Sequence, residues 1–355
     1  MSTQVLAKKQ LVLIKKQADW DTPNAITASG YTLLNGINVG SSIPDPDVNV
    51  DFGNFIGQYG TTDEIGRVYI DPNSGLPKLP FSGIATLETL APLFASIFQE
   101  VTEGASTPYD KAYVVKSKDE VIDFNTSKFL FTVLIVNFND AGNSISDITR
   151  MINCVVSDFE FTVEPNNRGF ARVAKVSGNF VASAVDYDTN SATLASYTNP
   201  TMTKLGDTVP FVLNVDTDSV AGEDLNGICF KRFSFKYDGN ISVDCRGAGG
   251  VPLTFKAMQQ FFFEITLPYI QAANYNTMVK NFADGKNVIV SFEYGTYGAG
   301  APYLYFVNSL GRQIRNPLAN EGDYWTRPIV IQCFSSAGTT NPVTASLVDA
   351  IDWGF

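Results

Sequence analysis

The chain of 355 residues carries 25 basic and 36 acidic side chains, a net charge of −11, and no histidine. The missing histidine excludes a Ser-His-Asp triad, a Cys-His pair and a histidine-ligated metal. The acidic balance argues against tight nucleic-acid binding, which needs clustered Lys and Arg. Apolar residues make up 45% of the chain and charged residues 17%, which predicts a folded protein rather than a disordered one.

The N-terminal residues predict neither export nor a membrane anchor. Lysines flank a four-residue apolar run in MSTQVLAKKQLVLIKKQ, and this run is too short for the core of a signal peptide. The longest apolar stretch, 129–138, is about half a membrane span. We therefore expect a protein that is made in a cytoplasm and has no membrane partner.

Hydrophobic patterning predicts strands along most of the chain. Segment 156–164 alternates clearly between polar and apolar residues and, with 170–184, predicts a long hairpin. In the second half, the turn Asp238-Gly239-Asn240 predicts another hairpin. The expected strands are 11–15, 31–39, 129–138, 154–164, 170–184, 228–237, 241–245, 251–267, 288–294, 303–307 and 329–334.

Two segments have the apolar spacing of amphipathic helices. Segment 86–101 places Leu87, Leu90 and Phe94 on one face and contains Pro92, which is expected either to kink the helix or to mark a restart. Segment 272–283 has a similar stripe. Each helix is expected to cover a face of a sheet, one in each half of the chain. The polar stretch 190–207 lies between the halves and predicts a domain boundary.

We find no residues in the sequence with the pattern of a catalytic, cofactor-binding or metal-binding site. Carboxylate pairs such as Asp216/Asp218, Glu223/Asp224 and Asp349/Asp352 arise by chance among 36 acidic residues, and the glycine-rich segment 247–250 lacks the Gly-Lys-Ser/Thr of a phosphate loop. We expect no enzyme activity, no cofactor and no metal.

The four cysteines, Cys154, Cys229, Cys245 and Cys333, form no C-x-x-C pair. Three of them, Cys154, Cys229 and Cys333, lie in apolar runs and are expected to be buried free thiols.

The aromatic content favours a protein that assembles with itself. The 26 Phe and 15 Tyr residues need more cover than two helices supply. Either two sheets pack face to face, or sheet edges and faces meet other copies of the chain.

The order of these elements resembles the major tail tube proteins of long-tailed (siphovirus-type) bacteriophages, in their larger form with two tube domains. The resemblance covers most of the chain, although each motif consists of common turn residues. The passages that carry it are 11–21 (LVLIKKQADWD), 22–25 (TPNA), 31–36 (YTLLNG), 76–77 (LP), 90–94 (LAPLF), 176–180 (VSGNF) and 233–240 (FSFKYDGN).

This resemblance implies a mainly β fold with two tandem sandwich or barrel-like tube domains, each with one flanking helix. The first would span 1–200, with a long inter-ring loop at about 39–83, and the second 201–355, with a C-terminal arm after residue 337 that also reaches between rings. The implied function is a structural virion protein that polymerises into stacked rings. These rings form the hollow tail tube through which DNA passes without specific binding.

The resemblance also implies partners. These are other copies of the chain, the tape measure protein, the tail terminator and the distal tail or baseplate proteins, in a virion tail assembled in the host cytoplasm. Tail tubes in this family resemble stacks of rings with six tube domains each. The resemblance therefore implies that three two-domain chains close one ring. The alternatives are another virion ring component, such as a baseplate hub or tail terminator, and a carbohydrate-binding or carbohydrate-cleaving β-sandwich.

Overall fold

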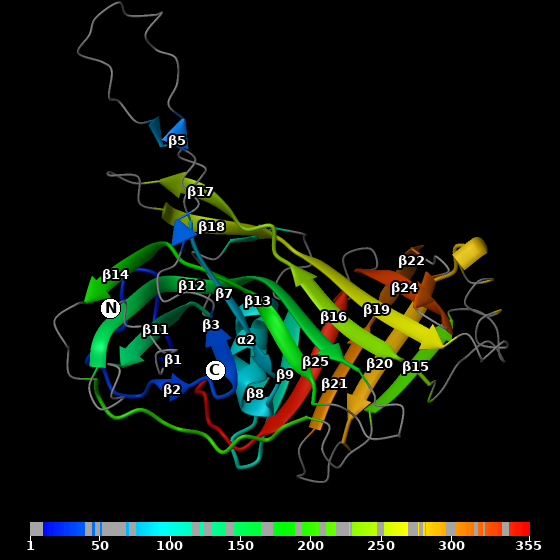
Figure 1. Ribbon diagram of the computed structural model, residues 1–355, viewed down its shortest axis with the longest axis horizontal. Coiled ribbons are helices and arrows are strands. Elements are labelled where there is room, and N and C mark those ends of the chain that lie inside the picture. The colour runs from blue at the N-terminus through cyan, green and yellow to red at the C-terminus, as the bar shows by residue number, and fades with distance from the viewer. Residues whose placement is uncertain are drawn as a thin grey trace, which may run out of the picture.

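The protein consists mainly of antiparallel β-strands, as the sequence predicted (Figure 1). The computed structural model describes residues 10–39, 76–115, 129–138, 145–164, 173–188, 194–205, 211–217, 229–246, 252–268, 282–295, 303–315, 324–335 and 341–355. Short pieces at 45–46, 50–51, 69–70, 121–123 and 319–321 and single residues 227, 276 and 280 complete the description.

The larger sheet is organised around strand β12 (Ile145–Val163), which is long enough to pair with four others. Its first part pairs with β11 (Phe131–Phe138) and β14 (Ala184–Asp188), and its second part with β13 (Lys175–Val181) and β16 (Arg232–Asp238). The sheet also includes β1 (Gln10–Lys16), β2 (Thr32–Leu33), β3 (Ile37–Val39), β4 (Asp45–Pro46), β7 (Pro77–Ile84), β19 (Gln260–Pro268), β22 (Leu310–Arg315), β23 (Ala319–Glu321) and β24 (Tyr324–Phe334).

A second sheet of six strands faces the first across the core. Its strands alternate between buried and exposed residues, as in β20, where every second side chain from Val288 to Tyr294 is buried. Its order is β15 (Phe211–Thr217), β20 (Val288–Tyr294), β21 (Tyr303–Asn308), β25 (Val343–Asp349), β9 (Tyr109–Val115) and β8 (Gln99–Glu103).

The two halves of the chain lie side by side in both sheets. In the larger sheet, β12 of the first half pairs with β16 of the second, and in the smaller sheet β9 pairs with β25. The strands of each half otherwise remain together. The expected division into 1–200 and 201–355, with its boundary in 190–207, stays a prediction, and the strand pairing shows that the two parts share both sheets. Hydrogen bonds of two continuous sheets cross the expected boundary.

Helix α2 (Leu87–Phe98) lies inside the core and does not flank it, which corrects the expectation from its apolar stripe. All twelve of its residues are buried, because one side packs on β8, β9 and β25 and another on β12. Its Phe94 meets Phe159 of the larger sheet and Phe306 of the smaller one. Where α2 is absent, the sheets touch directly, with Phe233 and Phe292 stacked at 4.2 Å.

The buried polar groups of α2 all have partners from distant parts of the chain or from its own cap. Glu88 accepts hydrogen bonds from the backbone N–H and the hydroxyl of Thr203, and Ser96 accepts one from the backbone N–H of Val156. Thr86 and Thr89 form a reciprocal capping box. The second expected helix, 272–283, lies mostly outside the described residues, although 276, 280, 282 and 283 are helical.

A small sheet projects from one side of the body, formed by β10 (Val121–Asp123), β17 (Ser242–Arg246) and β18 (Pro252–Met258) (Figure 1). Phe255 anchors it in an apolar cluster with Trp20 at 5.2 Å. The predicted hairpin of β16 with β17 is wrong, because both edges of β16 are already paired with β12 and β19. Asn240 (φ 43°) marks the departure of the chain.

The expected loop 39–83 begins and ends in the larger sheet. Strands β3 and β4 pair with β7, and the two-residue strands β5 (Val50–Asp51) and β6 (Tyr69–Ile70) pair with each other. β5 lies on the same side of the body as the projecting sheet (Figure 1). Residues 52–68 and 71–75 are outside the described part of the chain.

Candidate functional site

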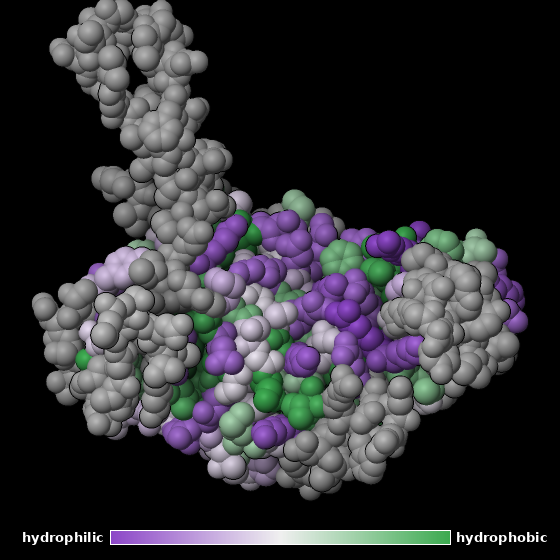
Figure 2. Space-filling view, viewed as in Figure 1, coloured by the Kyte–Doolittle hydropathy of each residue, from purple (hydrophilic) through white to green (hydrophobic). Residues whose placement is uncertain are grey.

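The outward face of the larger sheet forms a continuous polar surface across both halves, which we call the polar face. It carries the exposed or half-buried alternate residues of five adjacent strands, whereas their other side chains fill the core. Figure 2 shows hydrophilic side chains gathered over β16 and β19. The polar face comprises Lys78, Pro80 and Ser82 of β7, Lys175, Ser177 and Asn179 of β13, Asp158, Glu160 and Thr162 of β12, Arg232, Lys236 and Asp238 of β16, and Gln260, Phe262 and Glu264 of β19.

Charges at the centre of the polar face are paired across neighbouring strands. The Nζ of Lys236 lies 2.9 Å from Glu264 and 3.8 Å from Glu160. Glu160 also accepts a hydrogen bond of 2.8 Å from Arg232. These side chains are about one third exposed, so each pair contributes at most about 1 kcal/mol to stability. Their effect is to leave the surface hydrated and locally balanced in charge.

A shallow depression of about 530 Å³ lies where β7, β13, β12, β16 and β19 curve together. In it, the side-chain amide of Asn179 donates to both carboxylate oxygens of Asp158, at 2.9 and 3.0 Å. Gly178 allows this close approach, since a Cβ there would lie 2.3 Å from the carbonyl oxygen of Asp158.

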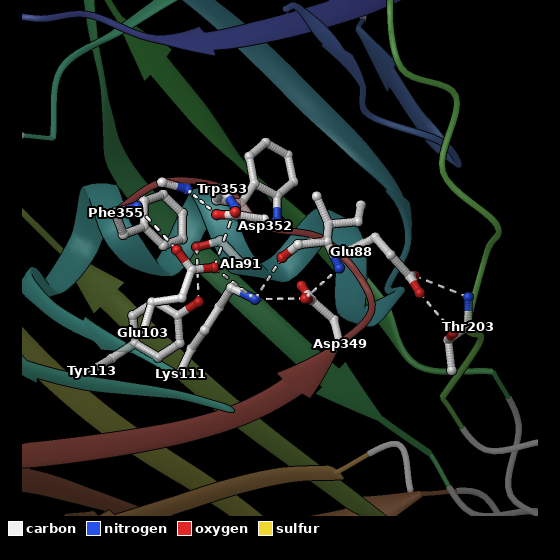
Figure 3. Close-up of polar contacts among 12 residues, drawn as sticks. Glu88, Ala91, Glu103, Lys111, Tyr113, Thr203, Asp349, Asp352, Trp353 and Phe355 are labelled. Carbon is white, nitrogen blue, oxygen red and sulfur yellow. Dashed lines mark hydrogen bonds and ion pairs between the residues drawn. The ribbon is translucent and has the colours of Figure 1, made fainter. Parts of the chain in front are cut away.

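A second site is buried: residues 350–355 bind between the two sheets through an ion cluster around Lys111, and we call this segment the C-terminal clasp (Figure 3). The fully buried Nζ of Lys111 lies 2.5 Å from Asp349 and 3.1 Å from Glu103, and donates to the carbonyl oxygen of Ile351. Glu103 in turn accepts the backbone N–H groups of Trp353 and Phe355.

The clasp connects the smaller sheet to the larger one. Lys16 of β1 donates to the carbonyl oxygen of Gly354 at 2.9 Å, and Phe355 packs edge-to-face on Phe129 at 5.9 Å. Trp353 stacks parallel to Phe355. The expectation of an arm that reaches between rings is therefore wrong for 341–355. These residues form β25 and a segment held against the protein's own body.

The cluster is dominated by carboxylates, and one of its oxygens has no partner among the described residues. Burial raises the pKa of Asp349, an effect that Lys111 opposes. Its Oδ2 and the indole Nε1 of Trp353 are both buried without a hydrogen bond to the described residues. Because Lys111 is fully buried, the cluster is suited to holding strands and the clasp together rather than to chemistry on a substrate.

Of the carboxylates considered from the sequence, Asp349 and Asp352 lie in or beside the C-terminal clasp. Asp349 binds Lys111, while Asp352 accepts the backbone N–H of Gly354. Asp218, Glu223 and Asp224 and the glycine-rich segment 247–250 lie outside the described residues. Within the described residues, no three Cys, Asp or Glu side chains gather to hold a metal.

The cysteine prediction is confirmed for Cys154 and Cys333, which are buried free thiols, and is wrong for Cys229, which is exposed. Cys229 and Phe230 precede β16 and lie outside any strand, and of the two only Phe230 is buried in the core.

Comparison with known proteins identifies no relative. No family model matches the chain, and no curated protein is significantly similar to it. Among the described residues, no helix combines the length and apolarity needed to cross a bilayer.

Proposed function

We propose that this protein is a structural, non-enzymatic virion component that polymerises into stacked rings and forms the hollow tail tube of a long-tailed bacteriophage. The observation that carries the proposal is the side-by-side arrangement of the two halves in two continuous sheets. A tube wall requires wedge-shaped units whose sheets follow one another around a ring. Joining two such units within one chain leaves fewer open strand edges to pair between chains.

In this proposal each half of the chain supplies one wedge, and three chains close a ring. The two wedges would be joined through the strand pairs β12–β16, β9–β25 and β10–β18. Six chains would supply twelve wedges and roughly double the bore, which would no longer confine a single duplex.

The polar face would line the channel. Its Lys and Arg side chains at the centre are bound to Glu160 and Glu264, so they offer few unneutralised cations to phosphates. The chain's net charge of −11 adds long-range repulsion. Both properties favour DNA that moves through the channel without specific binding.

The projecting β17–β18 sheet and the segment that leaves through β5 and β6 would contact the next ring in the stack. The projecting sheet and β5 lie on one side of the body (Figure 1), which favours stacking with a single polarity. The ends of a finished tube would then offer different surfaces to the tail terminator and to the distal tail or baseplate proteins. The tape measure protein would occupy the channel during assembly in the host cytoplasm.

Electron microscopy of the purified protein tests this function. We expect long hollow tubes, and a reconstruction should give three chains per ring with the polar face toward the channel. Discrete rings that never elongate would instead favour a baseplate hub or tail terminator. A protein that stays monomeric at every concentration and binds polysaccharide would favour the carbohydrate-binding alternative.

The stacking role of the projection has its own test. Deleting 53–67, which lies between the paired ends β5 and β6, should leave folded chains that form rings but do not elongate. Tubes of normal length from this variant would contradict the inter-ring assignment while leaving the ring itself unaffected.

A further inference from the structure

Two strands of the larger sheet that lie at opposite ends of the molecule, β22 and β14, carry different side chains (Figure 1). At one end, edge strand β22 exposes Arg312, Ile314 and Arg315, and the neighbouring end of β24 exposes Phe334. Ile314 is 50% exposed and occupies a β-bulge, where the pairing with β24 shifts between Gln313 and Arg315. We call these four residues the basic end.

At the opposite end of the molecule, strand β14 pairs with β12 on one side (Figure 1). Its Tyr187 is 54% exposed, the largest value among the exposed large apolar side chains. Asp186 beside it forms an ion pair with Arg150 and keeps 57% of its side chain exposed. A carboxylate has lone pairs for more than one donor, so Asp186 can accept a further hydrogen bond. We call Asp186 and Tyr187 the acidic end.

We propose that the basic end of one copy docks on the acidic end of the next copy. This inference rests on the proposed function and names the contact that would close the ring. Ile314 and Phe334 would pack against Tyr187, and Arg312 and Arg315 would approach Asp186. Because the two surfaces differ and lie at opposite ends, the contact is head-to-tail, the type that generates closed rings or open filaments.

Side chains, rather than a continuous backbone ladder, would specify this contact. The bulge at Ile314 disrupts the regular spacing of donors and acceptors along β22, and charged residues on an edge strand oppose non-specific strand addition. Opposite charges speed the encounter and select the correct orientation. Arg312 and Arg315 repel the same residues of another copy, so dimers through two basic ends are disfavoured.

Charge reversal tests the docking surface. Arg312→Glu with Arg315→Glu, and separately Asp186→Arg, should each raise the critical concentration for polymerisation about tenfold or more, because like charges then meet. A chain with all three substitutions should polymerise again, since its ends are complementary in the opposite sense. The control is Lys204→Glu, an exposed charge reversal next to Thr86 at the start of α2, away from both ends.

The outcomes separate this inference from the proposed function. If both reversed variants form tubes at the same critical concentration as the wild-type chain, the docking surface is wrong and the tube function is unaffected. A wild-type chain that never polymerises would overturn both. If the reversed variants do not fold, cross-linking of Ile314→Cys with Tyr187→Cys in a Cys229→Ser background decides instead. Covalent oligomers are expected, and tubes without them would overturn the proposal.

Discussion

The Nζ of Lys111 lies 2.5 Å from the Oδ1 of Asp349, and neither side chain is exposed to solvent. The two residues belong to β9 and β25, the neighbouring strands through which the halves of the chain join in the smaller sheet. The ion pair therefore lies at the junction between the halves and at the root of the C-terminal clasp. Its removal should affect the whole fold.

We expect Lys111→Met to destabilise the protein by about 3–5 kcal/mol, because Glu103 and Asp349 would be left buried without their cation. Urea unfolding followed by circular dichroism measures the change. Replacing Asp349 by Leu in the same chain should recover part of the loss. An unfolding free energy within error of wild type for Lys111→Met would show that the cluster is not a net source of stability.

The raised pKa of Asp349 predicts a specific pH dependence. Burial makes the folded state hold this proton more tightly than the unfolded chain does, so the contribution of Asp349 to stability is larger when it is protonated. It should decrease as the pH rises from the ordinary value of 3.8 through the raised folded value. The unfolding free energy of wild type minus that of Asp349→Asn should therefore fall as the pH rises through this range. A rise of this value with pH would contradict the direction of the shift.

Removal of the clasp, residues 350–355, should destabilise each subunit without preventing polymerisation. Phe129 would lose its contact with Phe355, and Glu103 would lose two backbone donors, which we expect to cost about 2–4 kcal/mol. Thermal unfolding measures the loss, and microscopy at low temperature shows whether tubes form. If the truncated chains fold but do not form elongated tubes, the segment would instead have the inter-ring role expected from the sequence.

Thiol reactivity should distinguish the cysteines. Cys229 is exposed and should react with a maleimide in the folded protein, whereas Cys154 and Cys333 are buried and burial raises the pKa of both thiols. Peptide mapping by mass spectrometry assigns the modified residues, and urea should make all of them reactive. Rapid modification of Cys154 in the folded chain would contradict the burial of this β12 residue in the core.

Periodicity predicted many of the strands because their alternation reflects a single buried face. β20 and the outer part of β12 are examples, and β19 was found within a longer run that Gln259 interrupts. Strand β9 was missed because its sequence, YDKAYVV, places Lys111 at an inward position. A buried lysine becomes favourable only through Glu103 and Asp349, and nothing local in the sequence signals the latter partner.

Helix α2 shows the limit of local pattern in another way. Its range was predicted to within a turn at its C-terminal end, but its apolar stripe indicated one covered face. The polar residues Glu88 and Ser96 are also buried, because Thr203 and Val156 supply their hydrogen bonds from far along the chain. Sequence patterns indicate which apolar side chains favour burial. Hydrogen bonds from distant residues are needed to offset the desolvation of buried polar side chains, and local patterns do not show them.

The junction of β9 with β25 has a consequence for synthesis. Val114 pairs with Thr344, so the edge of β9 remains open while 230 further residues are made. At about 5–20 residues per second this takes roughly 10–50 s. During that time the nascent chain exposes an unpaired, aromatic-rich edge on every ribosome translating the message. High-level production of a protein built in this way would place a steady demand on the chaperones of the cell that makes it.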